Sequence, residues 1–256
     1  MNHRGRRYWD LLFQMAFMQF KLKDQSTFFG FIWSFLNPII MLLIIYLVFS
    51  HRIGQDVNHY SIYVLIGIVH YTNFANTTSR SMSILHNMSK LTTDTTIPKE
   101  VLVIGSVLSS IIEFVLSLVI AVIIAYISGI HIGLSVINLP IVILLQLTLV
   151  LWISLILSCI YIFVRDTGHI YQVFLRVLFF ATPIFYTLDF LGNGIAKSIV
   201  SLNPLTHIID YSRLLIIEGH FFSMGGFSSL LMINIIMILF SFILFKKLEP
   251  SLAEHV

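Results

Sequence analysis

Apolar runs long enough to cross a lipid bilayer recur along this chain, and short polar stretches separate them. A membrane-spanning α-helix needs about 20 mostly apolar residues. By that measure we expect six spanning helices, at residues 31–50, 60–79, 101–127, 141–164, 170–186 and 227–245. The pattern therefore predicts an all-α membrane protein with short connections and one longer insert between the fifth and sixth spans.

The second span is the least hydrophobic of the six and carries a polar stripe. Four polar side chains share one helical face because they recur at i, i+3, i+4 and i+7. They are Asn73, Asn76, Thr77 and Arg80. Polar groups that face lipid are costly, so we expect this face to contact protein or a water-filled pathway.

The third span carries small or polar residues at every fourth position. They are Ser109, Glu113, Ser117, Ala121 and Ala125. Small residues at this spacing allow two helix backbones to approach closely. Packing against another helix of the same chain is the simpler interpretation, and a seam between two copies is the alternative.

The fifth span is short, and the stretch that follows it does not cross the membrane. Its 17 residues reach roughly 25 Å, less than the about 30 Å of a hydrocarbon core, and Pro183 disrupts its end. Farther on, Asn203 and Pro204 resemble a helix cap with proline in the first turn. We expect a helix over residues 204–218 that stops at Gly219. It is too short to span, which predicts short external re-entrant helices here.

The N-terminus begins with Arg4, Arg6 and Arg7 before an apolar stretch, in the manner of a signal peptide. No small-residue cleavage site follows, because the chain continues Lys-Leu-Lys-Asp from residue 21. We interpret Tyr8 to Lys23 as an amphipathic helix that lies in the cytoplasmic interface of the membrane.

Three parts result: a cytoplasmic segment at 1–30 with this interfacial helix, a six-helix transmembrane domain at 31–247, and a cytoplasmic tail at 248–256. Basic residues set the orientation, since they concentrate in cytoplasmic loops. With both ends inside, eleven basic residues are internal: Arg4, Arg6, Arg7, Lys21, Lys23, Arg80, Lys90, Lys99, Arg165, Lys246 and Lys247. Only Arg52, Lys197 and Arg213 are external, and Arg176 lies within a span.

Composition excludes a soluble domain. Hydrophobic residues form 57% of the chain, charged residues 11%, and the mean hydropathy is +0.93, whereas soluble domains carry about 25% charged residues. The net charge of +3 is not gathered into an aromatic-rich basic patch, so nucleic acid is not an expected partner. The one cysteine, Cys159, lies in an apolar run and is interpreted as a buried small side chain.

No catalytic or metal-binding constellation is present in the sequence. It has no HExxH, no GxSxG and no cysteine-rich site. The segment LGNGIAKS at residues 191–198 resembles a phosphate loop but lacks two of its glycines and is expected outside the cell. We expect no cofactor in this chain, so any ATP and Mg²⁺ would be bound by another subunit.

Two intramembrane charges and a set of aromatic residues remain as candidates for function. Arg176 could snorkel, could pair with Glu113 or Asp166, or could contact an anionic group on a transported molecule. Aromatic faces suit sliding sugar rings, whose C–H groups stack on them. The candidate channel lining is Trp33, Tyr71, Asn73, Asn76, Thr77, Phe179, Phe180 and Tyr186.

Four segments in register resemble the type-2 ABC export permeases for polysaccharides. The first is QFKLKDQSTFFGFIWSFLNPIIMLLIIYLVFS at 19–50, with a basic amphipathic helix, Gly-x-x-Trp and Asn-Pro. The second is 90–113, which contains Ile-Pro-Lys-Glu. The third is VRDTGHIYQVFLRVLFFATPIFYTLD at 164–189, and the fourth is SLNPLTHIIDYSR at 201–213.

This resemblance implies partners and a substrate class. It implies a homodimer of this chain with two cytoplasmic ATPase subunits and a polymer channel between the copies, in the cytoplasmic membrane of a prokaryote. The implied ATPase-docking residues are Leu91, Pro98, Lys99 and Glu100, and the implied external gate includes Asn203, Pro204 and Arg213. The implied cargo is O-antigen, capsular polysaccharide or teichoic acid on a polyprenyl-pyrophosphate carrier.

As a hypothesis, Lys21, Lys23 and Arg176 attract the pyrophosphate of this lipid-linked glycan. An alternative is a type-2 ABC permease for a drug or a small lipid. A membrane-embedded enzyme is disfavoured, because Asp166 and Asp189 are expected on opposite faces of the membrane. A purely structural subunit would leave the polar stripe of the second span unexplained.

Overall fold

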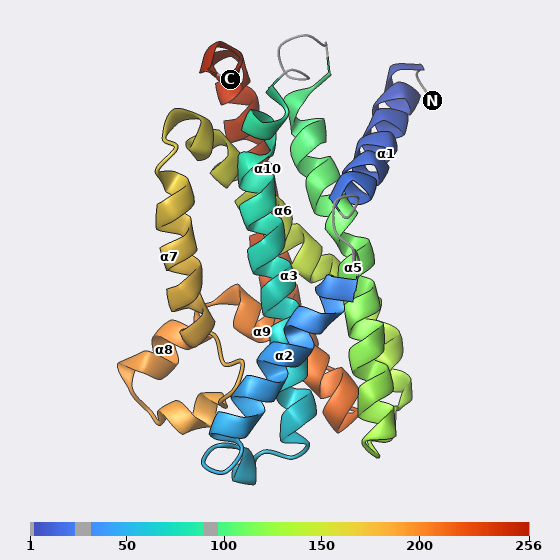
Figure 1. Ribbon diagram of the computed structural model, residues 1–256, viewed down its shortest axis with the longest axis vertical. Helices are drawn as coiled ribbons and strands as arrows, with labels where there is room; N and C mark the ends of the chain where they lie inside the picture. The colour runs from blue at the N-terminus through green and yellow to red at the C-terminus, as the bar shows by residue number, and fades with distance from the viewer. Residues whose placement is uncertain (1–2, 24–31, 90–96, 256) are drawn as a thin grey trace.

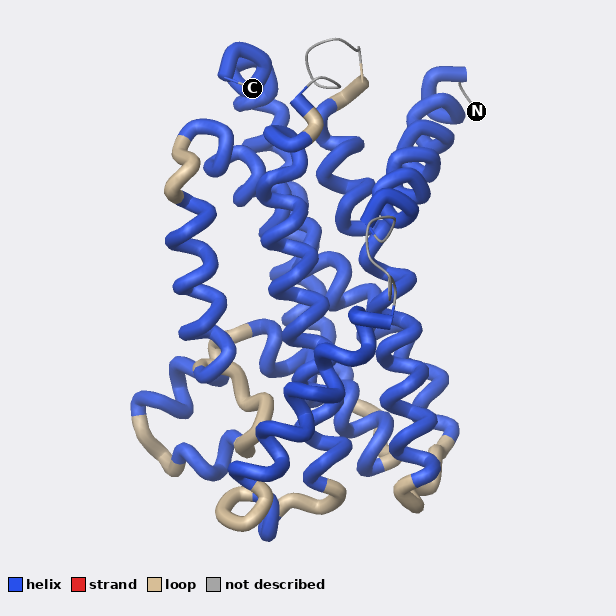
Figure 2. The backbone as a smooth tube through the Cα atoms, viewed as in Figure 1, coloured by secondary structure: helices blue, strands red, loops and turns tan. Residues whose placement is uncertain are grey.

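The computed structural model describes residues 3–23, 32–89 and 97–255, and every regular element within them is helical (Figure 2). The α-helices are α1 His3–Lys23, α2 Ile32–Phe49, α3 Tyr60–Asn87, α5 Lys99–Ile127, α6 Leu139–Phe163, α7 Thr167–Phe180, α8 Ile195–Ser201, α9 Pro204–Arg213 and α10 Met224–His255. Short 3₁₀ turns are η1 Gly54–Asp56, η2 Leu134–Asn138 and η3 Leu188–Leu191, and η4 Leu214–Glu218 is π-helical.

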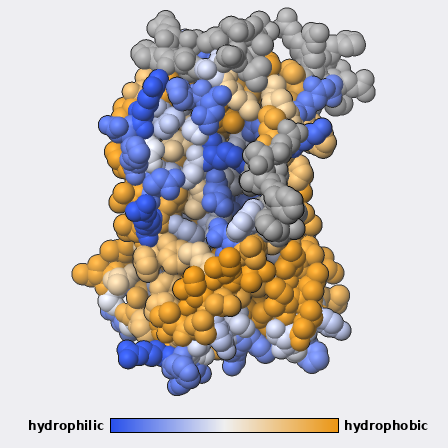
Figure 3. Space-filling model, viewed as in Figure 1, coloured by the Kyte–Doolittle hydropathy of each residue, from blue (hydrophilic) through white to orange (hydrophobic). Residues whose placement is uncertain are grey.

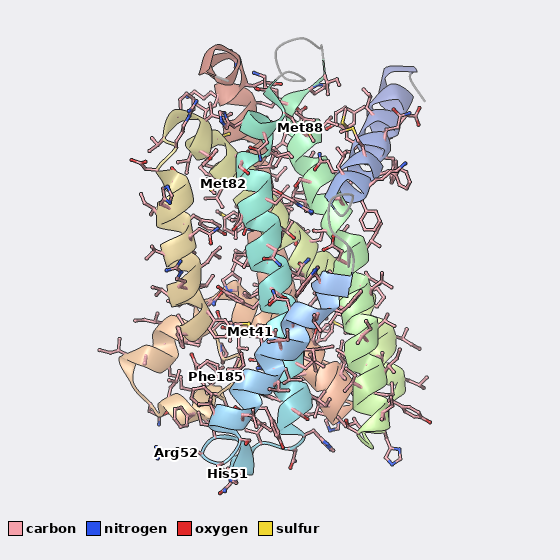
Figure 4. The ribbon with its side chains drawn as sticks, viewed as in Figure 1. Met41, His51, Arg52, Met82, Met88 and Phe185 are labelled. Atoms are coloured by element: carbon pink, nitrogen blue, oxygen red, sulfur yellow. The ribbon has the colours of Figure 1, made fainter. Side chains whose placement is uncertain are left out.

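The long helices run side by side along one axis, with α1 and the end of α10 at the same end of the bundle (Figure 1). Figure 4 places Met82 and Met88 toward that end, and His51 and Arg52 at the opposite end. Within the described residues, three helical stretches are long and apolar enough to cross a membrane by themselves. They are Lys99–Ile127, Leu134–Phe163 and Met224–Pro250. The chain is therefore an integral, all-helical membrane protein.

Helix α3 occupies the centre of the bundle, packed against α2, α5, α6, α7 and α9. Side chains on all of its faces are buried in its first half, among them Ile62, Val64 and Ile66. A helix enclosed by protein can carry polar residues, because its neighbours rather than lipid satisfy them. This position explains why the second predicted span is the least hydrophobic.

The apolar pattern located most helices and misplaced some of their ends. α5 and α6 begin within two residues of their predicted starts, and α9 with η4 covers the predicted 204–218 and stops at Gly219, whose φ is +69°. The second span extends beyond its predicted end at residue 79, because α3 continues to Asn87. The last span also extends beyond its predicted end at residue 245, because α10 continues through His255 and includes most of the predicted C-terminal tail at 248–256.

Helix α7 ends earlier than its predicted limit of Tyr186. It stops at Phe180, and the segment after it is buried without being helical. Non-helical backbone at membrane depth is tolerated only where protein satisfies its polar groups. Two tyrosines of α3 do this: Tyr60 donates to the carbonyl of Phe185 at 2.9 Å, and Tyr63 donates to that of Tyr186 at 3.1 Å.

Helix α1 is amphipathic, as its sequence predicted, and it lies against α5. Leu12 and Gln19 are buried, and the side-chain amide of Gln19 donates to the carbonyl of Leu102 at 3.1 Å. Trp9, Phe13 and Phe17 recur every four residues and are exposed. This outward apolar stripe suits a helix that rests in the membrane interface.

Candidate functional site

A groove of about 710 Å³ opens on one side of α3, between α2 and α7. Its apolar lining comes from all three helices and includes Met41, Tyr71, Leu175, Phe179 and Phe180. Its polar lining comes from α3 and α7 and consists of Asn76, Ser79, Arg80, Gln172 and Arg176. In Figure 3, hydrophilic surface gathers over the upper parts of α3 and α7, above a broad hydrophobic band. The groove therefore has both polar and apolar lining, and it is open on the outer surface of the chain.

Arg176 lines this groove and is exposed, and it lies nine residues after the start of α7. At 1.5 Å per residue it lies about 14 Å from that end of the helix. Among the described residues it forms no ion pair, so the structure does not pair it with Glu113 or Asp166. An unpaired guanidinium at membrane depth is costly unless water or an anionic ligand reaches it.

The aromatic wall of the groove is held in place by contacts between α3 and α7. The ring of Phe179 meets that of Tyr71 edge-to-face at 5.1 Å between centroids, and the Tyr71 hydroxyl donates to the carbonyl of Leu175. One turn away, Tyr171 donates to the hydroxyl of Thr78 at 2.7 Å. Phe180 remains 64% exposed, so it is the most accessible aromatic face here.

The polar stripe of the second predicted span divides between two surroundings. Asn73, Asn76, Thr77 and Arg80 line a separate cavity of about 130 Å³ against α5, together with Ser110, Glu113 and Ser117. Asn76 and Arg80 also reach the open groove. Arg80, counted above as a cytoplasmic loop residue, instead lies in a helix and donates to Ser109 at 3.0 Å.

The remaining candidate lining residues lie elsewhere. Trp33 is half-exposed at the start of α2, and neither it nor Tyr186 lines the groove. Tyr186 is buried, and its hydroxyl donates to the carbonyl of Phe180 at 2.8 Å. Lys21 is exposed on α1, which packs against α5 rather than α7, so the structure does not bring it to Arg176. Lys23 ends α1, and its side chain lies outside what the structure describes.

The candidate docking residues surround the start of α5. Leu91 lies outside the described residues, and Pro98 caps the helix without a side-chain bond. Lys99 and Glu100 are 6% and 3% exposed, respectively. The carboxylate of Glu100 pairs with Lys246 at 2.6 Å, which connects the start of α5 to the end of α10.

The candidate gate residues form a tightly bonded corner at the opposite end of the bundle. Asn203 caps α9 by accepting from the amide of Leu205 at 3.0 Å, with Pro204 in the first turn, as predicted. The Asn203 amide also donates to Thr182 at 2.9 Å. These bonds attach α9 to the segment that follows α7.

Arg213 holds three segments together at this end of the bundle, and we call it and its hydrogen-bond partners the Arg213 clamp. Its guanidinium donates to the carbonyls of Tyr63 and Ile184 at 3.2 and 2.9 Å, and to Asp210 at 3.1 Å. It also lies 3.4 Å from the ring centroid of Tyr63. Burial raises the pKa of the Asp210 carboxyl, and the adjacent Arg213 guanidinium opposes that rise. Arg213 thus joins α3, α9 and the segment after α7.

A buried polar network in the core was missed by the sequence interpretation. His70 contacts the hydroxyl of Ser212 at 2.8 Å and the side chain of Gln146 at 3.3 Å, linking α3, α9 and α6. Gln146 also donates to the carbonyl of His70 at 3.1 Å. The available signal was the lone glutamine within the apolar run of the fourth span, since a buried amide requires partners.

The fold and the groove define a class: a polytopic helical membrane protein with an amphipathic opening on one side, as a transport subunit requires. The chain belongs to the ABC-2 type transporter family, whose model matches residues 11–217. It is 26% identical over 251 residues to the O-antigen export system permease protein RfbA of Myxococcus xanthus, covering 98% of this chain and 96% of that protein. It is also 24% identical over 246 residues to the protein of the same name from Klebsiella pneumoniae, covering 96% and 94%.

Proposed function

We propose that this chain is the membrane permease subunit of an ATP-driven exporter for a lipid-linked polysaccharide. The observation that carries the proposal is the open groove, which combines exposed Arg176 with an aromatic wall. Family membership and the full-length similarity to permeases named for O-antigen export support it. The cargo is an O-antigen, a capsular polysaccharide or a teichoic acid on a polyprenyl-pyrophosphate carrier.

The proposed unit comprises two copies of this chain and two cytoplasmic ATPase subunits, which bind ATP and Mg²⁺. The one-sided opening of the groove supports a second copy, because two facing grooves would enclose a channel that neither encloses alone. We propose six spans, α2, α3, α5, α6, α7 and α10, within a permease domain at 31–247. Both chain ends lie on the cytoplasmic side of a prokaryotic membrane, in line with the excess of basic residues on that side, which remains ten to three after Arg80 is assigned to α3.

In the proposed mechanism, the pyrophosphate reaches the groove from the inner leaflet and contacts Arg176, with Arg80 on the facing helix. A guanidinium suits a diphosphate, because it can donate parallel hydrogen bonds to two of its oxygens. Arg80, whose Nη2 already donates to the carbonyl of Ser106 and to Ser109, adds positive charge. Lys21 and Lys23 on the interfacial helix attract the headgroup over a longer range. The glycan then passes the aromatic faces of Phe179 and Phe180, while ATP hydrolysis by the partner subunits drives the opening.

Arg176→Ala tests this assignment in a complex reconstituted with its ATPase. We expect the stimulation of ATP hydrolysis by lipid-linked glycan to fall by about tenfold or more, since a charge-assisted hydrogen bond contributes about 1.5–3 kcal/mol. Arg165→Ala, an exposed arginine just before α7 and outside the groove, is the matched control. If Arg176→Ala and Lys23→Ala both leave stimulation and export unchanged, the pyrophosphate assignment is wrong.

A drug or small-lipid exporter is the alternative cargo class. It would also need an ATPase, so recovery of a soluble ATPase with the chain supports both exporters over a membrane enzyme. Mass spectrometry of lipids in cells depleted of the chain separates the two cargoes. Accumulated lipid-linked glycan supports the polysaccharide exporter, and its absence favours the alternative.

A further inference from the structure

A second large cavity, of about 730 Å³, lies at the end of the bundle opposite to the chain termini. It is lined by the connection before α3, by Tyr63 of α3, by Thr187 after α7, and by six residues between positions 210 and 220. Its volume falls within the roughly 300–1,000 Å³ of small-molecule sites. It shares no lining residue with the groove between α2, α3 and α7.

Hydrogen bonds hold the side chains that form the floor of this cavity. Tyr63 is held through its hydroxyl by the carbonyl of Tyr186, and Arg213 covers its ring. The guanidinium of Arg213 is committed to two carbonyls and to Asp210, and it is only 4% exposed. The one arginine at the cavity is therefore already engaged and offers little positive charge to a ligand.

The walls of the cavity carry polar side chains that a ligand can reach. Asn58, His59, Glu218 and His220 line the cavity, and all four are exposed. No described residue forms a hydrogen bond or ion pair with the side chain of Glu218 or of His220. His59 adopts a left-handed backbone with φ +52°, which is strained for a residue with a side chain. The wall from Leu214 to Glu218 is π-helical. Both features concentrate at functional sites.

We propose that this cavity binds a short, uncharged segment of the emerging glycan. Sugar hydroxyls both donate and accept hydrogen bonds, and the cavity offers partners for both. These partners are the carboxylate of Glu218, the imidazoles of His59 and His220, and the amide of Asn58. Glu218 adds negative charge that Arg213 does not neutralise, so a phosphate-rich polymer such as a teichoic acid is repelled. The inference rests on the proposed export function and narrows its cargo to a glycan without backbone phosphate.

The test uses the full chain with its ATPase in lipid nanodiscs and two soluble probes. One probe is the glycan that accumulates in depleted cells, released from its lipid by mild acid, and the other is an oligomer of glycerol phosphate. Dissociation constants are measured for the unaltered complex and for Glu218→Gln, His220→Ala and His131→Ala. His131 is an exposed histidine outside the cavity and is the matched control.

We expect the released glycan to be uncharged and to bind, and Glu218→Gln and His220→Ala each to weaken binding by about tenfold. His131→Ala should bind as the unaltered complex does, and glycerol phosphate should not bind. A phosphate-bearing glycan, absence of binding, equal binding by all variants, or a preference for glycerol phosphate overturns the inference. None of these results bears on the effect of Arg176→Ala on stimulated ATP hydrolysis. The proposed export function is therefore tested separately from the proposed glycan site.

Discussion

Gly67 of α3 faces both the side chain of Arg213 and the segment after α7. A Cβ atom there would lie 2.9 Å from Nη2 of Arg213 and 3.1 Å from Cα of Ile184. The second contact is with backbone, which cannot rotate away. Glycine is therefore required at this position for close approach rather than for an unusual φ angle, and a side chain would push the clamp off its carbonyl acceptors.

Gly67→Ala should destabilise the chain by about 1–3 kcal/mol, the usual cost of overpacking a filled interior. Hydrogen exchange should increase in α9 and in residues 181–187, because the clamp holds both. Gly225→Ala is the control: its Cβ would meet nothing within 4 Å, and it lies in the first turn of α10. Alanine should be neutral or slightly stabilising there. Equal thermal unfolding of both variants would contradict the role given to Gly67.

The roles of individual residues could be predicted from the sequence where they depend only on neighbouring residues in the chain. Asn203 and Pro204 form the predicted cap because a capping side chain and a proline both act within one helical turn. The partners of Arg213 could not be predicted, since Tyr63 lies 150 positions away in the chain. Arg213 was assigned to the gate by resemblance, and its carbonyl acceptors follow only from the folded positions of α3 and α7.

At the scale of elements, the ends of α5 and α10 are coupled through a pair of charges. Glu100 has a side chain that is 4% exposed, and its Oε1 lies 2.6 Å from Nζ of Lys246. Its other oxygen is buried without a hydrogen-bond partner among the described residues. Lys246 also contacts Glu249 at 3.0 Å. The pair therefore ties α10 to the start of α5, beside the segment assigned to ATPase docking.

Lys246→Met should loosen this end of the bundle, because it leaves the buried carboxylate of Glu100 uncompensated. We expect a loss of about 1–3 kcal/mol, below the about 3–5 kcal/mol of fully buried pairs because water screens Lys246, whose side chain is 42% exposed. Lys247→Met removes the exposed neighbouring charge and should change stability little. Faster hydrogen exchange at the end of α10 in Lys246→Met alone would support the coupling, and identical exchange in both variants would contradict it.

Hydropathy located helices that face lipid better than those that do not. α5, α6 and α10 are long and apolar enough to be identified alone. α3 carries Arg80 and is enclosed by protein, so its length depends on neighbours that the local pattern does not contain. α7 stops at Phe180 because the proline-containing segment that follows finds its hydrogen bonds in α3 and Arg213. The groove lies between these two helices, and for that reason its walls were predicted only in part.

At the scale of the whole molecule, the two ends of the bundle are chemically different. The end with the chain termini carries α1 and the Glu100–Lys246 pair, whereas the opposite end carries the Arg213 clamp and the second cavity. The groove opens through the side of the bundle between them. This polarity matters for an exporter only if the terminal end is cytoplasmic, which makes the orientation the feature that most needs a direct test.

Single cysteines introduced at opposite ends can establish the orientation. The only native cysteine, Cys159, is 1% exposed, so we expect a labelling reagent to react with an introduced cysteine and not with Cys159. Because His51 lies at the end opposite to the termini (Figure 4), we expect His51→Cys to react with a membrane-impermeant maleimide in intact spheroplasts. Lys247→Cys, near the C-terminus, should react only after the membrane is permeabilised. The unaltered chain should react in neither condition. The reverse pattern would place both chain ends outside. Labelling of both variants in intact spheroplasts would mean that an even number of crossings separates residue 51 from residue 247, and this would contradict the odd number in the proposed topology.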